Sequence, residues 1–397
     1  MKILVLSFYY PPDLSAGSFR AVALVEALIE LSSSDLKIDV ITTLPNRYGS
    51  FSAQAQAQEN DGQLHIRRIQ LPEHHGGMVD QAKAFFSYAR EVSTLTKGQK
   101  YDLVYATSSR LMTATLGAWI SRRLNIPLYL DVRDIFVDTI KDVLSGKGAF
   151  LFKPIFSVLE RWTINRALHV NLVSQGFEPY FKNRYPKKSL SFFTNGIDEE
   201  FLRQKIKDNP DRLDACRSIS VLYAGNIGEG QGLHAIIPAL AQQLGERVKF
   251  KLIGDGGRQP QLKLALAGAG VNNVELVTPM SRKALLDEYL AADVLFLHLN
   301  DYDAFEKVLP SKIFEYAAMG TPIWAGVSGY AAQFLRKEVS NVAVFSPCDV
   351  EQAITVFERL DLRAAPRDAF VQRFSRKRIM RMMAADVLAC AGERAMS

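Results

Sequence analysis

The chain has 397 residues, and its 48 Lys and Arg against 42 Asp and Glu give a formal net charge of +6. This length exceeds one ordinary domain and predicts two, while 48% hydrophobic and 23% charged residues exclude a mostly disordered chain. The small positive excess suits an anionic partner, such as a nucleotide phosphate, a lipid headgroup or nucleic acid. Charge alone does not choose among these.

The cysteines and the hydropathy of the chain indicate in which cellular compartment the protein is expected. Cys216, Cys348 and Cys390 lie far apart with no CxxC pair, so we expect neither a disulfide framework nor a zinc site, and we expect a reducing cytoplasm. The N-terminal apolar run is short and is followed by Pro11 and Pro12, which indicates a buried strand rather than a signal peptide. Since no run of 18 apolar residues occurs, we expect no membrane-spanning helix.

Short apolar runs alternate with helical patterns along the chain. Expected strands are 2–7, 37–42, 65–69, 103–106, 127–131, 170–174 and 191–194, then 220–223, 249–253, 274–277, 294–297, 322–324 and 342–345; helical patterns include 19–30, 236–244 and 282–291. The alternation predicts an α/β protein with two Rossmann-like parallel-sheet domains facing across a cleft.

The pattern of strands and helices restarts near Ser220, after the polar stretch 205–212. We therefore place an N-terminal domain at 1–200 and a C-terminal domain at 217–375, with the boundary in the linker between them. A C-terminal helix at 376–397 could pack back on the N-terminal domain.

Loops that follow strands are the candidate sites, because ligands in open parallel sheets bind at the carboxyl ends of the strands. In the first such loop, residues 10–20, Gly17 would allow close backbone approach and Ser18 would cap a helix that begins near Phe19. Free N–H groups at that helix start would suit an anion. An ordinary capped loop is the equal alternative, and no GxGxxG motif supports a dinucleotide-type turn.

Two further loops in the first half carry polar residues. Arg133 and Asp134 directly follow a strong strand, which favours presentation of one of them to the cleft over an internal Arg–Asp salt bridge. Residues 193–198 read as a tight turn in which Gly196 has positive φ. We interpret this turn as a hinge between the domains rather than a catalytic element.

A glycine-rich loop opens the second half at 223–232. It follows a strand and precedes a helix, so its backbone N–H groups could hold a phosphate; the candidate residues are Gly225, Asn226, Gly228, Gln231 and Gly232. A second glycine turn, with Gly254, Asp255 and Gly256, either hosts a nucleobase edge or simply reverses the chain.

The most informative stretch is 309–323. We expect Ser311 to N-cap a helix that runs to Met319 and ends at Gly320. Lys312 at the helix start opposes the helix dipole unless an anion binds there, and Glu315 lies one turn further on. This spacing predicts a cation for a diphosphate and a carboxylate for ribose hydroxyls; the alternative is a surface ion pair between i and i+3.

These motifs in this order resemble those of the family 4 retaining glycosyltransferases, especially the sugar transferases of O-antigen, capsule and exopolysaccharide assembly. The resemblance covers nearly the whole chain and rests on Tyr-Pro-Pro at 10–12, Val-Arg-Asp at 132–134, Thr-Asn-Gly-Ile-Asp at 194–198, Tyr-Ala-Gly-Asn-Ile-Gly at 223–228 and Leu-Pro-Ser-Lys-Ile-Phe-Glu-Tyr at 309–316.

The resemblance implies a GT-B fold and a retaining enzyme without an essential metal. It implies a nucleoside-diphosphate sugar donor, with UDP expected, and a polyisoprenyl-diphosphate-linked or glycan acceptor. Catalytic roles would fall to Arg133, Asp134, Lys312 and Glu315, and donor contacts to the two glycine loops, Gly17, Ser18, Leu309 and Ser311. Nucleic-acid binding is not expected.

Several positions depart from the family pattern. Glu315 matches the second carboxylate of an E-x7-E motif, but Lys307 stands at the first, with Glu306 one residue off. Asn226 and Gln231 replace the usual Arg and Lys of the glycine-rich loop. The missing first carboxylate leaves a donor-binding pseudoenzyme or assembly scaffold as the alternative function.

A membrane surface is a further expected partner. Phe152, Ile155, Phe156 and Leu159 recur at helical spacing, and the segment 141–188 carries nine Lys or Arg against three Asp or Glu. An apolar face beside basic residues is typical of an interfacial helix, so we expect peripheral association with the inner face of the cytoplasmic membrane. The alternative is that this stripe packs into the first domain.

Overall fold

A computed structural model describes residues 1–13, 15–32, 34–45, 55–72, 78–108, 111–135, 147–202 and 217–392, without the side chains of 78, 79, 81 and 147–153. The chain forms two compact units, one of Met1–Asn195 with Arg376–Ser397 and one of Gly196–Ser375. Most of the expected linker, residues 203–216, lies outside the described residues.

The first unit is built on an eight-stranded sheet in the order β3-β4-β2-β1-β5-β6-β7-β8. Its strands are β1 (Lys2–Leu6), β2 (Lys37–Thr43), β3 (Gln58–Asp61), β4 (Leu64–Ile69), β5 (Leu103–Thr107), β6 (Leu128–Val132), β7 (His169–Leu172) and β8 (Ser189–Ser191). All neighbours pair in parallel except β3 with β4. The central strands β1, β5 and β6 are buried along their length except for Lys2, as expected for a sheet covered on both faces.

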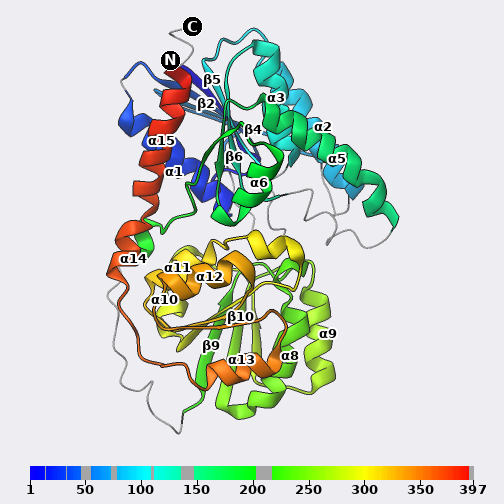
Figure 1. Cartoon of the computed structure of the whole chain (residues 1–397), viewed down its shortest axis with the longest axis vertical. Coiled ribbons are helices and arrows are strands. Elements are labelled where there is room, and N and C mark those ends of the chain that lie inside the picture. Colours follow the sequence, from blue (N-terminus) through cyan, green and yellow to red (C-terminus); the bar gives the residue numbers. More distant parts are fainter. Residues whose placement is uncertain are drawn as a thin grey trace. The chain divides into compact units, whose positions relative to one another are not determined.

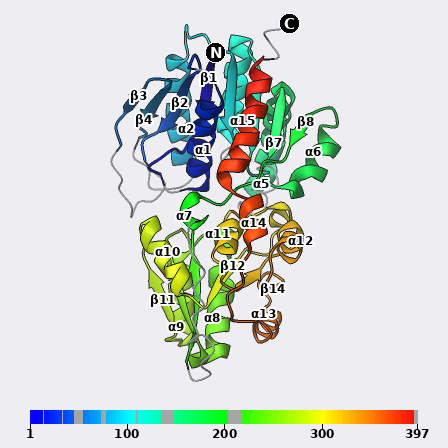
Figure 2. The same ribbon diagram turned by 90° about the vertical axis from the view of Figure 1, so that its left-hand side faces the viewer.

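Helices flank this sheet: α1 (Ala16–Leu31), α2 (Met78–Leu95), α3 (Leu111–Leu124), α5 (Lys147–Arg166), α6 (Glu178–Arg184) and α15 (Arg376–Gly392). The last helix, at the red end of the chain, lies beside the blue α1 (Figures 1 and 2). Its residues Ile379, Met380, Met383 and Val387 are buried, so the C-terminal helix belongs to the core of the first unit.

The second unit holds a six-stranded parallel sheet in the order β11-β10-β9-β12-β13-β14. Its strands are β9 (Ile219–Ala224), β10 (Val248–Ile253), β11 (Val274–Val277), β12 (Val294–His298), β13 (Ile323–Gly326) and β14 (Val342–Phe345). The order reverses between β9 and β12, which makes the carboxyl ends of these two strands the expected place for a ligand.

Helices also accompany this second sheet: α7 (Glu199–Leu202), α8 (Leu233–Leu244), α9 (Gln259–Ala269), α10 (Arg282–Ala291), α11 (Lys312–Ala318), α12 (Gly329–Glu338), α13 (Val350–Phe357) and α14 (Asp368–Arg373). One apolar core joins the sheet to α8, α9 and α13, and it includes Phe250, Phe296, Trp324 and Phe345. A core of this kind holds the strand ends, and the loops that follow them, in fixed positions.

The two parallel-sheet α/β domains predicted from the alternation of strands and helices are confirmed. The expected bounds of β11, α10 and β14 match the structure residue for residue. The strand expected at 191–194 is wrong, because β8 ends at Ser191. Strand β3 was not predicted, since its residues Gln-Glu-Asn-Asp are all exposed and an antiparallel edge strand needs no apolar alternation.

Candidate functional site

The glycine-rich loop and the second glycine turn are neighbours, because β9 and β10 pair in register. Tyr223 pairs with Leu252 and Ala224 with Ile253, so the two strands end side by side. Gly225 then donates its N–H to the Ile253 carbonyl at 2.9 Å, and Ile227 donates to the Asp255 carbonyl at 2.9 Å. The predicted phosphate loop therefore rests on the second turn.

Gly254 is required by this close packing. A Cβ placed on Gly254 would lie 1.8 Å from the Gly225 carbonyl oxygen, and one on Gly256 would lie 2.5 Å from the Ile227 carbonyl oxygen. Both contacts are far shorter than van der Waals distance, so any side chain there would push the two loops apart. The close packing of the two loops therefore explains why glycine stands at both positions. A contact between this turn and a nucleobase stays a prediction.

The glycine-rich loop keeps backbone donors available. Among the described residues, none accepts a hydrogen bond from the backbone N–H of Asn226 or Gly228. The Asn226 side chain donates to Gln231 Oε1 at 2.8 Å, which ties the two ends of the loop together where the resembled family has Arg and Lys. Gly232, with φ of 59°, caps helix α8. Exposed backbone N–H groups of this kind can hold an anion.

Glu229, an acidic residue in this loop, forms an ion pair and a hydrogen bond that the sequence did not indicate. Glu229, in the 3-10 helix Glu229–Gln231, pairs with Arg258 and accepts the Tyr302 hydroxyl. Although burial opposes them, these contacts lower the pKa of Glu229, the Tyr302 hydrogen bond most strongly. Arg258 follows the second glycine turn, so the pair fastens the two loops to each other.

Lys312 and Glu315 form a partly buried ion pair on α11. The distance from Lys312 Nζ to Glu315 Oε2 is 2.8 Å, and the two side chains are 26% and 12% exposed. Lys312 Nζ also donates to the Tyr289 hydroxyl at 2.9 Å. Burial lowers the pKa of Lys312, but attraction to Glu315 outweighs burial and raises it. Lys312 is therefore charged, and Glu315 compensates its unfavourable place at the helix start.

Tyr316 connects this pair to the glycine-rich loop. Its hydroxyl accepts a hydrogen bond from the Ala224 backbone N–H at 3.1 Å, one residue before Gly225. The Tyr316 ring packs edge-on against Tyr289, with 5.3 Å between centroids. The i,i+3 ion pair that was the alternative interpretation of Lys312 and Glu315 is thus present, but beside the predicted phosphate loop rather than on an open surface.

Two details of the 309–323 prediction need revision. Ser311 occupies the predicted N-cap position directly before α11, but the predicted side-chain cap is absent: Ser311 has helical φ and ψ and its side chain makes no capping hydrogen bond. Leu309 is buried at 4% exposure, so only its backbone could reach a ligand. The end of the helix is as expected, since Gly320 follows it with φ of 68°.

In the first unit, the side chain of Arg133, which follows β6, contacts the first residue of α1. Its guanidinium contacts the Ala16 carbonyl at 3.4 Å and its backbone N–H donates to Ser108 Oγ at 3.0 Å. Arg133 is half-buried and Asp134 is exposed. Arg133 and the first turn of α1, which contains Gly17 and Ser18, are therefore brought together.

The expected role of Ser18 is wrong. Helix α1 begins at Ala16, and Ser15 is its cap, with its side chain accepting from the Ser18 N–H at 3.1 Å. Gly17 and Ser18 lie inside the first turn and are buried. The earlier start follows because Ser15 offers the same capping chemistry three residues sooner.

Arg20 and Asp131 form a fully buried ion pair in the first unit. Arg20 Nε and Nη2 donate to the two Asp131 oxygens at 2.7 and 2.9 Å, and both side chains are 1% exposed. Tyr105 and Asn171 donate to the same carboxylate. The internal salt bridge considered for the loop after β6 exists, but its cation comes from α1 rather than from Arg133.

The turn at 193–198 differs from its prediction. Gly196 is not among the glycines with positive φ, so that part of the prediction is wrong. Arg20 instead binds the carbonyls of Phe193 and Thr194, both at 2.7 Å. The two compact units divide between Asn195 and Gly196, within this turn; its action as a hinge stays a prediction.

One group of described side chains could hold a metal ion, although none was expected. His169, Asp386 and Cys390 place their ligand atoms within 4.8 Å of one another. His169 Nε2 lies 3.2 Å from Asp386 Oδ2, and Tyr129 donates to the same oxygen at 2.8 Å. These contacts already fasten α15 to β6 and β7, so the group has a structural role without a metal.

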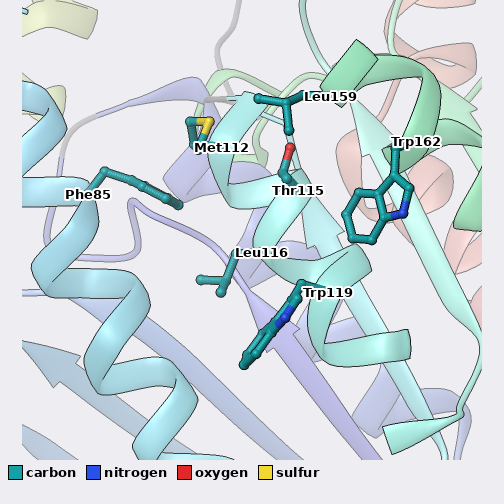
Figure 3. A pocket seen from close by; sticks show the side chains of 7 residues that line it. All are labelled: Phe85, Met112, Thr115, Leu116, Trp119, Leu159 and Trp162. Atoms are coloured by element: carbon teal, nitrogen blue, oxygen red, sulfur yellow. The ribbon is translucent and has the colours of Figure 1, made fainter. Parts of the chain in front are cut away.

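An apolar groove opens between α2, α3 and α5 of the first unit (Figure 3). It has a volume of about 360 Å³ and is lined by Phe85, Met112, Thr115, Leu116, Trp119, Leu159 and Trp162. Ile155 and Val158, on the neighbouring turn of α5, are 54% and 68% exposed. Within the described residues, no helix is both long enough and apolar enough to cross a bilayer.

The predicted apolar stripe of α5 divides in two. Leu159 and Phe156 are half-buried, as the packing alternative requires, while Ile155 is exposed; the side chain of Phe152 lies outside the described residues. Lys188, one of the nine basic residues in the segment 141–188, donates to the Asn165 and Ala167 carbonyls at 2.7 and 2.6 Å and so caps the end of α5. The helix thus has a buried face and an exposed apolar face.

Comparisons with known proteins agree with this arrangement. The chain matches the family described as "Glycosyl transferase 4-like domain" over residues 20–195 and that described as "Glycosyl transferases group 1" over residues 208–372. It is 27% identical over 205 residues to WcaI of Escherichia coli (strain K12), whose name assigns it to colanic acid biosynthesis as a glycosyl transferase. That match covers 48% of this chain and 49% of WcaI, about half the length of each.

Solved structures are similar over the whole chain. Sucrose-phosphate synthase from Thermosynechococcus elongatus has a TM-score of 0.67 at 14% identity, covering 100% of this chain and 97% of that one. Anabaena HepE, solved in complex with UDP and glucose, has a TM-score of 0.68 at 18% identity, covering 98% and 99%. At these identities the likeness concerns the fold alone.

Proposed function

Since this chain is a glycosyltransferase of the GT-B fold, with a 4-like domain followed by a group 1 domain, we propose that it moves a sugar from a UDP-sugar to a lipid-linked or glycan acceptor in cell-surface polysaccharide synthesis. We propose further that the transfer retains the configuration at the anomeric carbon. The complexes of Anabaena HepE with UDP and with UDP-glucose and the name of WcaI support the choice of donor and pathway class.

The observation that carries the proposal is that Lys312 and Glu315 each keep hydrogen-bonding capacity that their contacts with described residues do not use. Lys312 Nζ has three donors, of which two go to Tyr289 and Glu315. Both hydrogen bonds of Glu315 use Oε2, so among the described residues Oε1 has no partner. A third ammonium donor for the diphosphate and a carboxylate oxygen for ribose hydroxyls are what a nucleoside-diphosphate donor needs.

The leaving group would be stabilised without a metal. As the bond between the anomeric carbon and the diphosphate breaks, negative charge grows on the diphosphate. The backbone donors of Asn226 and Gly228 and the Lys312 ammonium would bind that charge. The acceptor hydroxyl would attack from the same face, form the new glycosidic bond and give its proton to the departing phosphate, with Arg133 and Asp134 positioning the substrates.

A membrane surface is proposed as the place where this protein meets its acceptor. Support comes from the exposed apolar residues Ile155 and Val158 beside the groove, and from Phe86 on α2, which is 72% exposed. Large exposed apolar side chains are unfavourable in water and favour an interface. A polyisoprenyl-diphosphate acceptor would be reached from there.

Transfer can be tested by incubating the purified chain with a panel of nucleotide sugars and a polyisoprenyl-diphosphate-linked glycan, read by mass spectrometry. We expect one sugar to be added from a UDP donor, with UDP released. Binding of UDP without release or transfer from any donor would instead identify a donor-binding protein that has lost catalysis, and the anomeric configuration of the product decides retention.

A further inference from the structure

His298 lies at the point where the strand order of the second sheet reverses. It is the last residue of β12, next to β9, whose carboxyl end continues into the glycine-rich loop. The imidazole is 1% exposed and belongs to none of the motifs recognised in the sequence. A buried histidine at the expected ligand-binding edge of an α/β sheet calls for an explanation.

Both ring nitrogens of His298 are bound to backbone groups of two different loops. Nδ1 lies 2.7 Å from the Gln231 carbonyl oxygen, and Nε2 lies 3.0 Å from the Cys348 backbone nitrogen. A carbonyl can only accept and an N–H can only donate, so Nδ1 carries the proton and Nε2 accepts. The ring therefore links the end of the glycine-rich loop to the turn after β14.

The neighbourhood fits a neutral imidazole at this position. Phe296 and Phe345 stack on the ring, at 6.0 and 6.1 Å between centroids. A Cβ on Gly326 would lie 2.3 Å from His298 Cδ2, so glycine leaves the room that the ring occupies. Burial lowers the pKa of His298 to about 4, although the Gln231 carbonyl opposes this. The ring is uncharged under ordinary assay conditions.

We propose that His298 is a positioning residue for the donor: its Nδ1–H holds the Gln231 carbonyl and thereby fixes the glycine-rich loop in the form that binds the donor diphosphate. Gln231 is the residue before Gly232, the cap of α8, and its side chain also holds Asn226. The orientation of the backbone donors of Asn226 and Gly228 thus depends on where Gln231 is held. This inference rests on the proposed function only for the identity of the ligand.

Two substitutions separate the two nitrogens. In His298→Asn the amide can reach the position of Nδ1 and donate to Gln231, while in His298→Gln it reaches the position of Nε2 and serves Cys348. Both variants lose the ring and its two stacking contacts, so their melting temperatures should fall by similar amounts. Each is neutral like the parent imidazole, which removes charge as a variable.

The test measures UDP binding by calorimetry and amide hydrogen exchange of the ligand-free full chain. We expect His298→Asn to bind UDP within about threefold of wild type and His298→Gln to bind about tenfold more weakly, the size of one net hydrogen bond. Exchange should rise at 225–232 only in His298→Gln and at 346–349 only in His298→Asn.

Each outcome decides the proposal. Equal exchange at 225–232 in both variants, or UDP affinity that follows melting temperature rather than the identity of the side chain, would overturn it. If wild type fails to bind UDP while the crossed exchange pattern holds, the choice of donor is wrong and the positioning role stands.

Discussion

Glu315 accepts hydrogen bonds from Lys312 and Tyr289 through the same oxygen, Oε2, at 2.8 and 3.3 Å. One carboxylate therefore holds the ammonium and the phenol together, while Oε1 has no partner among the described residues. Glu315 thus has a structural contact through Oε2, and the ligand-binding role that we propose for it would use Oε1.

We predict that Glu315→Ala weakens donor use by about 1–3 kcal/mol, the cost of a lost ribose contact, and also lowers thermal stability because Lys312 loses its counterion. Glu315→Gln should retain more of the stability while still raising KM for the donor. Steady-state kinetics and thermal unfolding measure the two effects.

The control for the two Glu315 variants is Glu288→Gln, which removes the charge of another partly exposed carboxylate, bound to Lys251 at 2.7 Å. This pair lies outside the proposed site, so donor kinetics should not change. Wild-type kinetics in a folded Glu315→Ala variant would refute the assignment.

The Arg20–Asp131 pair should make the first unit sensitive to acid. Burial raises the pKa of Asp131, but attraction to Arg20 and the hydrogen bonds it accepts outweigh burial, so the pKa is lowered below the ordinary value. A lowered native pKa means that the pair stabilises fully above the unfolded pKa, about 3.9, and that this stability is lost as pH falls through the native value. Urea unfolding at a series of pH values measures the loss.

Removing one partner should cost far more than removing a surface charge. We expect Arg20→Met to lose about 3–5 kcal/mol of unfolding free energy at neutral pH, because Asp131 remains buried without a cation. Lys182→Met, which breaks the exposed i,i+4 pair with Glu178, should lose less than about 1 kcal/mol. Similar losses in both variants would mean that burial of the Arg20 pair has no energetic consequence.

Transfer activity should persist in EDTA, since the proposed charge stabilisation uses Lys312 and backbone N–H groups. Activity and melting temperature are measured together with and without chelator. A fall in melting temperature with activity retained would indicate a structural ion at His169, Asp386 and Cys390. Complete loss of activity that magnesium or manganese restores would contradict the metal-independent mechanism.

The membrane proposal predicts co-sedimentation with anionic liposomes that weakens as salt is raised, because basic residues near the surface contribute about 1 kcal/mol each under screening. The double variant Ile155→Asp with Val158→Asp should abolish binding while leaving the fold intact, as both side chains are more than half exposed.

Leu264→Asp is the control for that double variant, because Leu264 is 73% exposed on α9 of the other unit. It should bind liposomes like wild type. If the double variant binds equally well, the face beside the groove is not the membrane face; if wild type does not bind at low salt, the association itself is wrong.

The sequence by itself determined the two parallel-sheet domains, because buried parallel strands are continuous apolar runs. The glycosyltransferase class followed from the resemblance of its loop motifs, in their order along the chain, to those of a known family. The sequence also indicated Lys312 and Glu315, whose one-turn spacing on a helix brings them together without help from the rest of the chain. The roles proposed for them, and for Arg133 and Asp134, stay predictions.

Only the tertiary structure decided which distant residues form hydrogen bonds and ion pairs with one another. Arg20 meets Asp131 across 111 positions, and His298 meets Gln231 and Cys348 across 67 and 50. Local pattern cannot specify such pairs, because the hydrogen-bond partner of a buried polar group is set by which strands become neighbours in the sheet. His298 was not singled out in the sequence: a lone histidine at the end of an apolar run is a weak signal, and its role depends on the loops that folding brings to it.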